Sequence, residues 1–177
     1  MWFEGNRRTA RAIRVGSLTL GGGAPVSVQS MLNTDSRDAA ACVAQAERLC
    51  REGCELIRMA VPVKEAAPTL AALKEAGIRV PLVADIHFDY RIALEAVACG
   101  ADKIRINPGN IGSDERVRAV VEACRAHGIP IRIGVNAGSL QKDILAKYGG
   151  PTPEALAESA MTHVRLLERF DFDNIVV

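Results

Sequence analysis

The sequence predicts an α/β protein, a TIM-like (β/α) barrel of which this chain carries about the first five and a half βα units. One unit recurs at intervals of roughly 20–30 residues: a short strand, a polar loop, an amphipathic helix and a glycine. The strands are rich in Val and Ile, which is typical of parallel strands covered by helices. No Gly-x-Gly-x-x-Gly sequence follows the first of them, which argues against a dinucleotide-binding fold.

The chain divides into an N-terminal segment, residues 1–24, and a partial barrel, residues 25–177. The first segment holds a β-hairpin from Ile13 to Leu20 that turns near Gly16-Ser17, followed by a three-glycine turn. The barrel strands are expected at Pro25–Met31, Glu55–Val61, Pro81–Phe88, Lys103–Asn107, Pro130–Asn136 and Asn174–Val177.

Apolar residues at helical spacing predict five helices between and after these strands. Their apolar faces are centred on 43–50, 70–73, 92–97 and 117–124, and a fifth begins near Pro153 and runs through Leu156, Met161, Val164 and Leu167. The glycines that close the first four helices, each suited to the left-handed position past a helix end, are Gly53, Gly77, Gly100 and Gly128.

Composition excludes several classes of function. The chain has 177 residues, a formal charge of +1 and no basic excess, so a general nucleic-acid surface is not expected. No run approaches the roughly 18 apolar residues of a membrane span, and residues 1–14 lack a signal-peptide core, so we expect a cytoplasmic protein. The five cysteines lack a Cys-x-x-Cys pair and are expected to be reduced thiols in the core; they are Cys42, Cys50, Cys54, Cys99 and Cys124.

The number of units does not complete a barrel. An eight-fold barrel takes about 250 residues, whereas this sequence stops inside its sixth predicted strand. We therefore expect a piece of a longer protein that folds poorly alone, because an open barrel has unpaired strand edges.

Three predicted strands place an arginine between two large apolar residues: Arg58, Arg105 and Arg132. A guanidinium stays charged at ordinary pH, so its burial is unfavourable unless an anion meets it. One such arginine is explained equally well by a structural salt bridge. Three in the same local setting favour a site for an anion with several charges, a phosphate or diphosphate.

Alternation along the strands places further polar residues on the same faces. Asp85 and His87 share one face, Arg105 shares one with Asn107, and Arg132 shares one with Asn136. These residues lie toward the C-terminal strand ends, where barrels of this class bind ligands. The alternatives are that Asp85 and His87 only orient each other or cap the next helix, and that Asn107 serves the turn after it.

Other polar residues have weaker signals. His127, just before a glycine that closes a helix, is expected to interact with the helix dipole, and His163 is expected to be a surface or packing residue. Lys142, Lys147 and Tyr148 lie in an irregular stretch where a structural and a functional role both remain open.

Several long motifs resemble the 4-hydroxy-3-methylbut-2-enyl diphosphate synthase family of the non-mevalonate isoprenoid pathway. The resemblance covers nearly the whole chain from about Arg11. One departure is Leu32, where the family usually has Thr. The motifs that carry the resemblance are Val28-Gln29-Ser30-Met31, the stretches 83–91, 105–112 and 132–140, Lys147-Tyr148-Gly149 and Pro151-Thr152-Pro153.

The resemblance implies an oxidoreductase with a TIM-like barrel that binds 2-C-methyl-D-erythritol 2,4-cyclodiphosphate and opens its ring reductively. It also implies a C-terminal domain with a 4Fe–4S cluster, two electrons from ferredoxin or flavodoxin, and a homodimer in which that domain covers the partner's barrel. By motif, Arg58, Arg105 and Arg132 would bind the diphosphate with His87, Asn107 and Asn136 beside them, and Asp85 would orient the site. None of the five cysteines lies in the family's cluster motif, so no metal ligand is expected here.

Two other interpretations remain open. The chain could belong to another phosphate-handling barrel, such as a pteridine-diphosphate transferase of the dihydropteroate synthase type, whose motifs differ from those above. It could also be a catalytically silent binding or oligomerisation module, because no redox centre is visible in the sequence.

Overall fold

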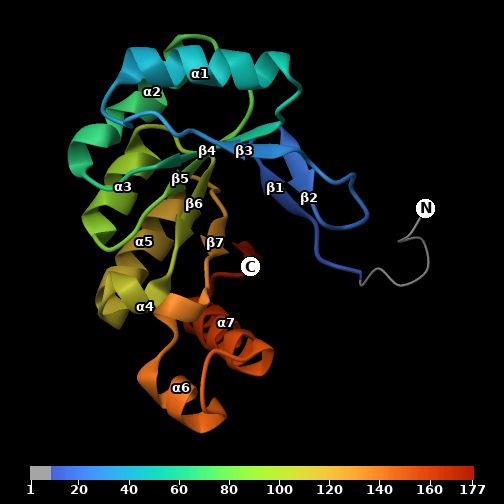
Figure 1. Ribbon diagram of the computed structural model, residues 1–177, viewed down its shortest axis with the longest axis vertical. Helices are drawn as coiled ribbons and strands as arrows, with labels where there is room; N and C mark the ends of the chain where they lie inside the picture. The colour runs from blue at the N-terminus through green and yellow to red at the C-terminus, as the bar shows by residue number, and fades with distance from the viewer. Residues whose placement is uncertain (1–8) are drawn as a thin grey trace.

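The computed structural model describes residues 9–177 and contains one six-stranded parallel sheet. The strands follow one another in sequence order, as in a (β/α) barrel. Helices lie along the outer, convex side of the curved sheet (Figure 1). The strands are β3 (Gln29–Met31), β4 (Leu56–Ala60), β5 (Leu82–Asp85), β6 (Lys103–Ile106), β7 (Ile131–Ile133) and β8 (Ile175–Val176).

The predicted helices are present, and the glycines close them as expected. Gly53, Gly77, Gly100 and Gly128 all have positive φ, between 66° and 90°. Pro153 is the first residue of its helix, behind the N-cap Thr152. The helices are α1 (Ala39–Arg51), α2 (Pro68–Glu75), α3 (Tyr90–Ala98), α4 (Pro108–Ile111), α5 (Asp114–Ala126), α6 (Lys142–Tyr148) and α7 (Pro153–Glu168), with 3-10 turns η1 (Lys64–Ala66) and η2 (Ala137–Ser139).

The structure differs from the sequence expectation in three respects. The strands are shorter than predicted; the fifth ends at Ile133 rather than Asn136. The short helices α4 and α6 were not predicted, because each has too few turns to show a helical apolar period. Met161 was expected on the apolar face of α7 but is 46% exposed. The buried residues of α7 recur every four positions, and Met161 lies off that stripe; they are Ala155, Ser159, His163 and Leu167.

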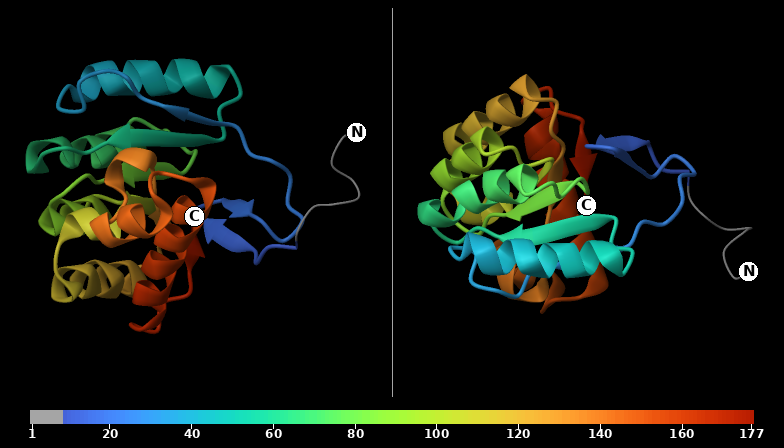
Figure 2. Two further views of the ribbon diagram at one scale, coloured as in Figure 1. Left: turned by 60° about the horizontal axis from the view of Figure 1, so that its bottom comes forward. Right: turned by 90° about the horizontal axis from the view of Figure 1, so that it is seen from above.

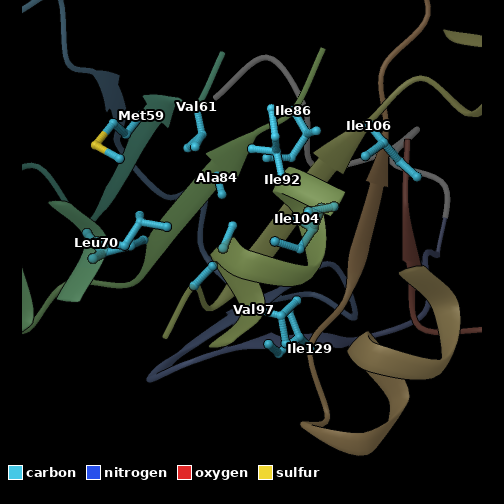
Figure 3. Packing of buried hydrophobic residues seen from close by; sticks show 14 of the residues in the cluster. Met59, Val61, Leu70, Ala84, Ile86, Ile92, Val97, Ile104, Ile106 and Ile129 are labelled. Carbon is cyan, nitrogen blue, oxygen red and sulfur yellow. The ribbon is translucent and has the colours of Figure 1, made fainter. Parts of the chain in front are cut away.

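The main core lies between the sheet and the helices. Figure 3 shows strand residues such as Ala84 and Ile104 close to the helix residues Leu70, Ile92 and Val97. In β4, β5, β6 and β7 this core takes every second residue, and the alternate residues face the inside of the curve.

The β1–β2 hairpin closes the N-terminal end of that inner side. Strands β1 (Ile13–Val15) and β2 (Leu18–Leu20) pair antiparallel around Gly16-Ser17, as predicted (Figure 2). Ile13 and Val15 form a second small core with Leu56 and Val83, the inward residues at the starts of β4 and β5. The inner side of the sheet therefore has an apolar floor at one end.

The cysteines are free, and most are in the core. Cys42, Cys54 and Cys124 are buried, and Cys50 and Cys99 are half-buried. Burial raises the pKa of the Cys124 thiol to about 12, so its reactive thiolate is scarce at neutral pH. Among residues 9–177, no helix is long and apolar enough to cross a membrane.

Candidate functional site

The three arginines lie on the inner side of the sheet, in one neighbourhood. Arg58 is on β4, Arg105 on β6 and Arg132 on β7. The residues directly before and after each arginine point the other way, into the helix-side core. The register pairs Asp85 of β5 with Arg105, and Arg105 with Arg132. Three of the predicted polar residues therefore sit at the same level of the sheet.

Asp85 holds two of these arginines. Its side chain is 3% exposed. Arg105 donates from Nη1 to Oδ1 over 3.1 Å, and Arg58 donates to Oδ2 from Nε over 3.1 Å and also from Nη2. Arg58 and Arg105, which the sequence presented as free anion ligands, thus already have one internal carboxylate between them. Asp85 lies where it orients both guanidinium groups.

Arg132 has no such partner among residues 9–177. It is half-buried, and within the described residues no carboxylate forms an ion pair with it. Burial lowers its pKa, and the positive charges of Arg58 and Arg105 lower it further. Three guanidinium groups therefore face one carboxylate, which leaves two positive charges unbalanced. This is the electrostatic setting of an anion site.

The three arginines line a cavity of about 380 Å³, together with Gly134 and residues of α7 that include Leu156. Gly134 follows the end of β7, and a Cβ built there would overlap the Arg105 guanidinium. Because Gly134 has no side chain, the Arg105 guanidinium can lie against its backbone. The cavity is large enough for a small diphosphate ester.

His87 and Asn107 lie just beyond the C-terminal ends of β5 and β6, and neither is among the residues that line the arginine cavity. His87 Nε2 lies 3.7 Å from Asp85 Oδ2, beyond hydrogen-bond range, and its side chain is 41% exposed. Asn107 is 1% exposed; its Oδ1 accepts the Gly109 N–H over 3.1 Å, which is the turn role that the sequence left open. Its Nδ2 has no hydrogen-bond partner in the described chain, so a buried amide donor remains for a ligand.

Asn136 does not join this group. Strand β7 ends at Ile133, and Asn136 is an exposed residue at the start of η2, where its backbone N–H faces Ser139 Oγ at 3.4 Å. It is not among the residues that line the arginine cavity. Alternation predicts its direction poorly because the regular strand has ended three residues earlier.

Lys103 is a buried cation of the inner face that the sequence interpretation missed, although it does not line the arginine cavity itself. It precedes Arg105 by two positions on β6, so both side chains face inward, and it is only 2% exposed. Burial lowers its pKa to about 8, with Arg132 and Arg58 as further causes. The alternating order Lys103, Arg105, Asn107 was a signal that could have identified it.

A polar network around His163 was also missed. His163 is 4% exposed, and its Nε2 lies 3.4 Å from Nε2 of Gln141, whose Oε1 accepts the Ser159 hydroxyl over 2.6 Å. The edge of its ring is close to Gly109, in the turn that follows Asn107. His163 is thus a packing residue that connects α7 to the turns after β6 and β7.

The remaining polar candidates have structural contacts. His127 ends α5, and its Nδ1 lies 2.9 Å from the Ala123 carbonyl oxygen. Lys147 and Tyr148 both donate to Glu158 Oε2 over 2.6 Å, which ties α6 to α7. None of these residues lines the arginine cavity.

A second hollow, of about 370 Å³, lies at the opposite end of the sheet. Its lining includes Lys74 and Asp102, which form an ion pair over 3.0 Å. Lys74 is therefore already paired with a carboxylate, unlike Arg132.

The arrangement offers guanidinium donors suited to an anion, with the imidazole of His87 beside Asp85. It does not fit an iron–sulfur cluster. Residues 9–177 contain no group of three or more His, Cys, Asp or Glu side chains placed to hold a metal. The buried cysteines belong to the helix-side core, away from the arginines.

Sequence comparison supplies the family. The model of the GcpE TIM-barrel domain matches residues 10–177. A relative from Pseudomonas savastanoi, named 4-hydroxy-3-methylbut-2-en-1-yl diphosphate synthase (flavodoxin), is 58% identical over 97% of this chain and 46% of its own length. A relative of the same name from Hahella chejuensis is 55% identical over 100% of this chain and 48% of its own length. The chain spans about half the length of the curated relatives it matches.

Solved structures support the barrel architecture. A dihydropteroate synthase from Vibrio fischeri has a TM-score of 0.60 at 16% identity, covering 94% of this chain and 65% of that one. The enzyme from Xanthomonas albilineans has a TM-score of 0.58 at 20% identity, covering 92% and 61%. These likenesses show the fold alone. The family match over residues 10–177, the inward arginines and the sequential parallel sheet agree: the chain belongs to the GcpE TIM-barrel domain family.

Proposed function

We propose that Arg58, Arg105 and Arg132 bind the diphosphate of 2-C-methyl-D-erythritol 2,4-cyclodiphosphate. The chain would then supply the substrate-binding barrel of a 4-hydroxy-3-methylbut-2-enyl diphosphate synthase, an oxidoreductase of isoprenoid biosynthesis. One observation carries the proposal: of three inward guanidinium groups that line a 380 Å³ cavity, two share the carboxylate of Asp85 and the third, Arg132, has no carboxylate partner among the described residues. The names of relatives at 55–58% identity support the choice of this diphosphate over others.

Each residue has a separate role in this proposal. Arg132 makes the main new ion pair, because it has no internal counter-charge among the described residues. Asp85 holds Arg58 and Arg105 at fixed angles, and the guanidinium N–H groups that it leaves free point to the ligand. The unpaired Nδ2 of Asn107 donates to a ligand oxygen.

His87 is the proposed proton-transfer residue. It stands beside Asp85 at the open end of the site, where a neutral imidazole can donate a hydrogen bond to a phosphate oxygen and an imidazolium can protonate a leaving oxygen. Asn136, carried over by motif, lies outside the cavity, so we assign it contact with a ligand only if the η2 turn moves toward the site.

Ring opening of this substrate is reductive and needs two electrons. The 4Fe–4S cluster that the family resemblance implies does not fit the described residues of this chain, and we assign its ligands to sequence outside it. We take flavodoxin as the electron donor, because the relatives' names include it, with ferredoxin as the alternative. A homodimer in which a cluster domain covers the barrel is the assembly we propose.

The dihydropteroate synthase interpretation is not favoured. Those enzymes share the fold at 16–20% identity, whereas the sequence relatives at 55–58% identity have the other name. Binding of a pteridine diphosphate in preference to the cyclodiphosphate would reverse this choice.

The test is Arg132→Met in the protein encoded by the full reading frame that includes this chain. Titration calorimetry with the cyclodiphosphate should show binding weaker by about 1.5–3 kcal/mol, the loss expected for one charge-assisted contact. Stability should change little or rise, because an unpaired half-buried charge is removed.

Arg79→Met is the matched control. Arg79 is an exposed arginine before β5, at the opposite end of the sheet, and its replacement should leave affinity unchanged. If Arg132→Met unfolds the protein while the folded fraction keeps full affinity, Arg132 is a structural residue and the proposal fails.

A further inference from the structure

Lys103 is the most deeply buried charged side chain of the inner sheet face, and the roles proposed above do not use it. Its 2% exposure is unusual for lysine, which is rarely fully buried without a partner. Within residues 9–177 no carboxylate comes within ion-pair distance of its ammonium group. A buried cation without a counter-charge calls for an explanation.

The floor of the sheet explains the burial. Lys103 is the register partner of Val83, which packs on Ile13 and Val15 of the hairpin. Lys103 therefore starts β6 beside the apolar side chains of the floor. On the other side, Arg105 follows it on the same face of β6.

The charges around Lys103 are nearly all positive. Arg58 of β4 and Arg132 of β7 act on it from the two sides, and both lower its pKa. The single acid of the cluster, Asp85, is engaged by Arg58 and Arg105. The inward residues that approach from β8 and the hairpin are apolar: Val176, Ile13 and Val15. An anion held by the arginines is the group that would offset this repulsion.

We propose that Lys103 is a fourth cation of the anion site, which acts on the bound diphosphate from the floor side and takes up a proton from solvent when the anion binds. The inference rests on the proposed function, because it needs a multiply charged anion at the three arginines.

The lysine's titration range makes this measurable. With a pKa of about 8, Lys103 is roughly half protonated at pH 8 in the free protein. An anion at the arginines favours the charged form, so binding at pH 8 should take up about half a proton and at pH 6.5 almost none from this group. Affinity should fall as pH rises through 8, because Lys103 is then neutral in the free protein and has to take up a proton before its charge can act on the anion.

The cyclodiphosphate is a suitable probe for proton counting. Each of its phosphorus atoms carries one strongly acidic hydroxyl, so the charge of the free ligand is constant between pH 6.5 and 9. Protons taken up therefore belong to the protein. His87 is unchanged in the Lys103→Met variant, so the difference in proton uptake between wild type and this variant belongs to Lys103.

The experiment is titration calorimetry on the protein from the full reading frame, in Tris and in HEPES at pH 8 and at pH 6.5. The dependence of the measured heat on buffer gives the protons taken up. Wild type should take up about half a proton at pH 8, and Lys103→Met should take up none. If the anion raises the pKa by about one unit, Lys103→Met should also bind about tenfold more weakly at pH 7.

Lys103→Arg is the matched variant, because it keeps the charge at every pH used. It should bind with near wild-type affinity at pH 7, without proton uptake and without the loss of affinity above pH 8. Thermal unfolding of both variants establishes that they fold, since Arg is the larger side chain.

The outcomes are separable. If wild type does not bind the cyclodiphosphate, the proposed function fails first. If wild type binds but Lys103→Met shows the same proton uptake and affinity, the arginines are sufficient and Lys103 is a structural residue. If Lys103→Met is more stable than wild type but loses proton uptake and affinity for the cyclodiphosphate, then Lys103 contributes to binding and lowers the stability of the free protein.

Discussion

The Cα hydrogen of Gly134 points at the guanidinium of Arg105, and a methyl group there would occupy the same space. Arg105 reaches Asp85 along this route, over 3.1 Å from Nη1 to Oδ1. The glycine after β7 therefore positions an arginine of β6. Its role is steric, since its φ lies outside the left-handed range that favours glycine.

The first prediction follows from this contact. Gly134→Ala should displace Arg105 from Asp85, lower stability by about 1–3 kcal/mol through overpacking, and weaken cyclodiphosphate binding at least about tenfold. Gly138→Ala is the control, because a Cβ at Gly138 meets only Asn136 Oδ1, at an ordinary 3.5 Å. Calorimetry and thermal unfolding of both variants check the prediction, and equal behaviour would contradict it.

Asp85 should be important for stability before any ligand is present. Asp85→Asn removes the carboxylate shared by Arg58 and Arg105, and we expect a loss of about 2–4 kcal/mol, because breaking a buried pair leaves charges uncompensated. Pyrophosphate should raise the unfolding temperature of the variant more than that of wild type, since an added anion replaces the lost charge.

Asp35→Asn is the comparison for that variant. Asp35 pairs with Arg37 on the surface, where ion pairs contribute little, so the change should have no measurable effect on unfolding. A similar loss from both variants would mean that the position of Asp85 inside the sheet is unimportant.

His87→Ala should lower turnover by about 10²–10⁴-fold, the range for loss of a positioned proton donor, while binding weakens much less. The iron–sulfur absorption of the whole protein should be unchanged, because His87 is not placed as a metal ligand. His127→Ala, at the exposed end of α5, should be nearly normal. Loss of the absorption in the His87 variant would show that its role is different.

His163 should make stability depend on pH. Burial lowers its pKa below the ordinary value of 6.5, so between the two values the unfolded chain binds more protons than the folded one. Stability then rises with pH and is lost as pH falls from about 6.5 toward the folded pKa. His163→Gln should reduce this acid loss in thermal unfolding scans, whereas the surface change His127→Gln should leave it in place.

Much of the fold could be predicted from periodicity. The glycines Gly53, Gly77, Gly100 and Gly128 lie where a left-handed residue ends a helix, and only glycine takes that conformation without strain. The inward direction of Arg58, Arg105 and Arg132 followed from alternation within regular strands. Each of these features depends only on residues close together in the chain, so it can be predicted from a single sequence.

The contacts between strands could not be predicted in the same way. That Asp85 meets Arg58 and Arg105 depends on the register of three strands, and that Gly134 makes room for Arg105 depends on the path after β7. Asn136 was expected near the arginines because the strand was expected to continue to it. Lys103 was overlooked because a lone lysine at the start of a strand is ordinarily a surface residue.

The hairpin floor makes the two ends of the inner side of the sheet different: one is closed by apolar residues and the other is open. Apolar side chains such as Val15 and Leu56 close one end with a medium of low polarizability, so the field of the arginines is weakly screened there and emerges mainly at the opposite end. An anionic ligand is thus attracted from one side only. Added salt should lower the association rate constant and leave the dissociation rate constant nearly unchanged. The reason is that ions screen the approach through the open end of the site rather than the contacts already made at the floor.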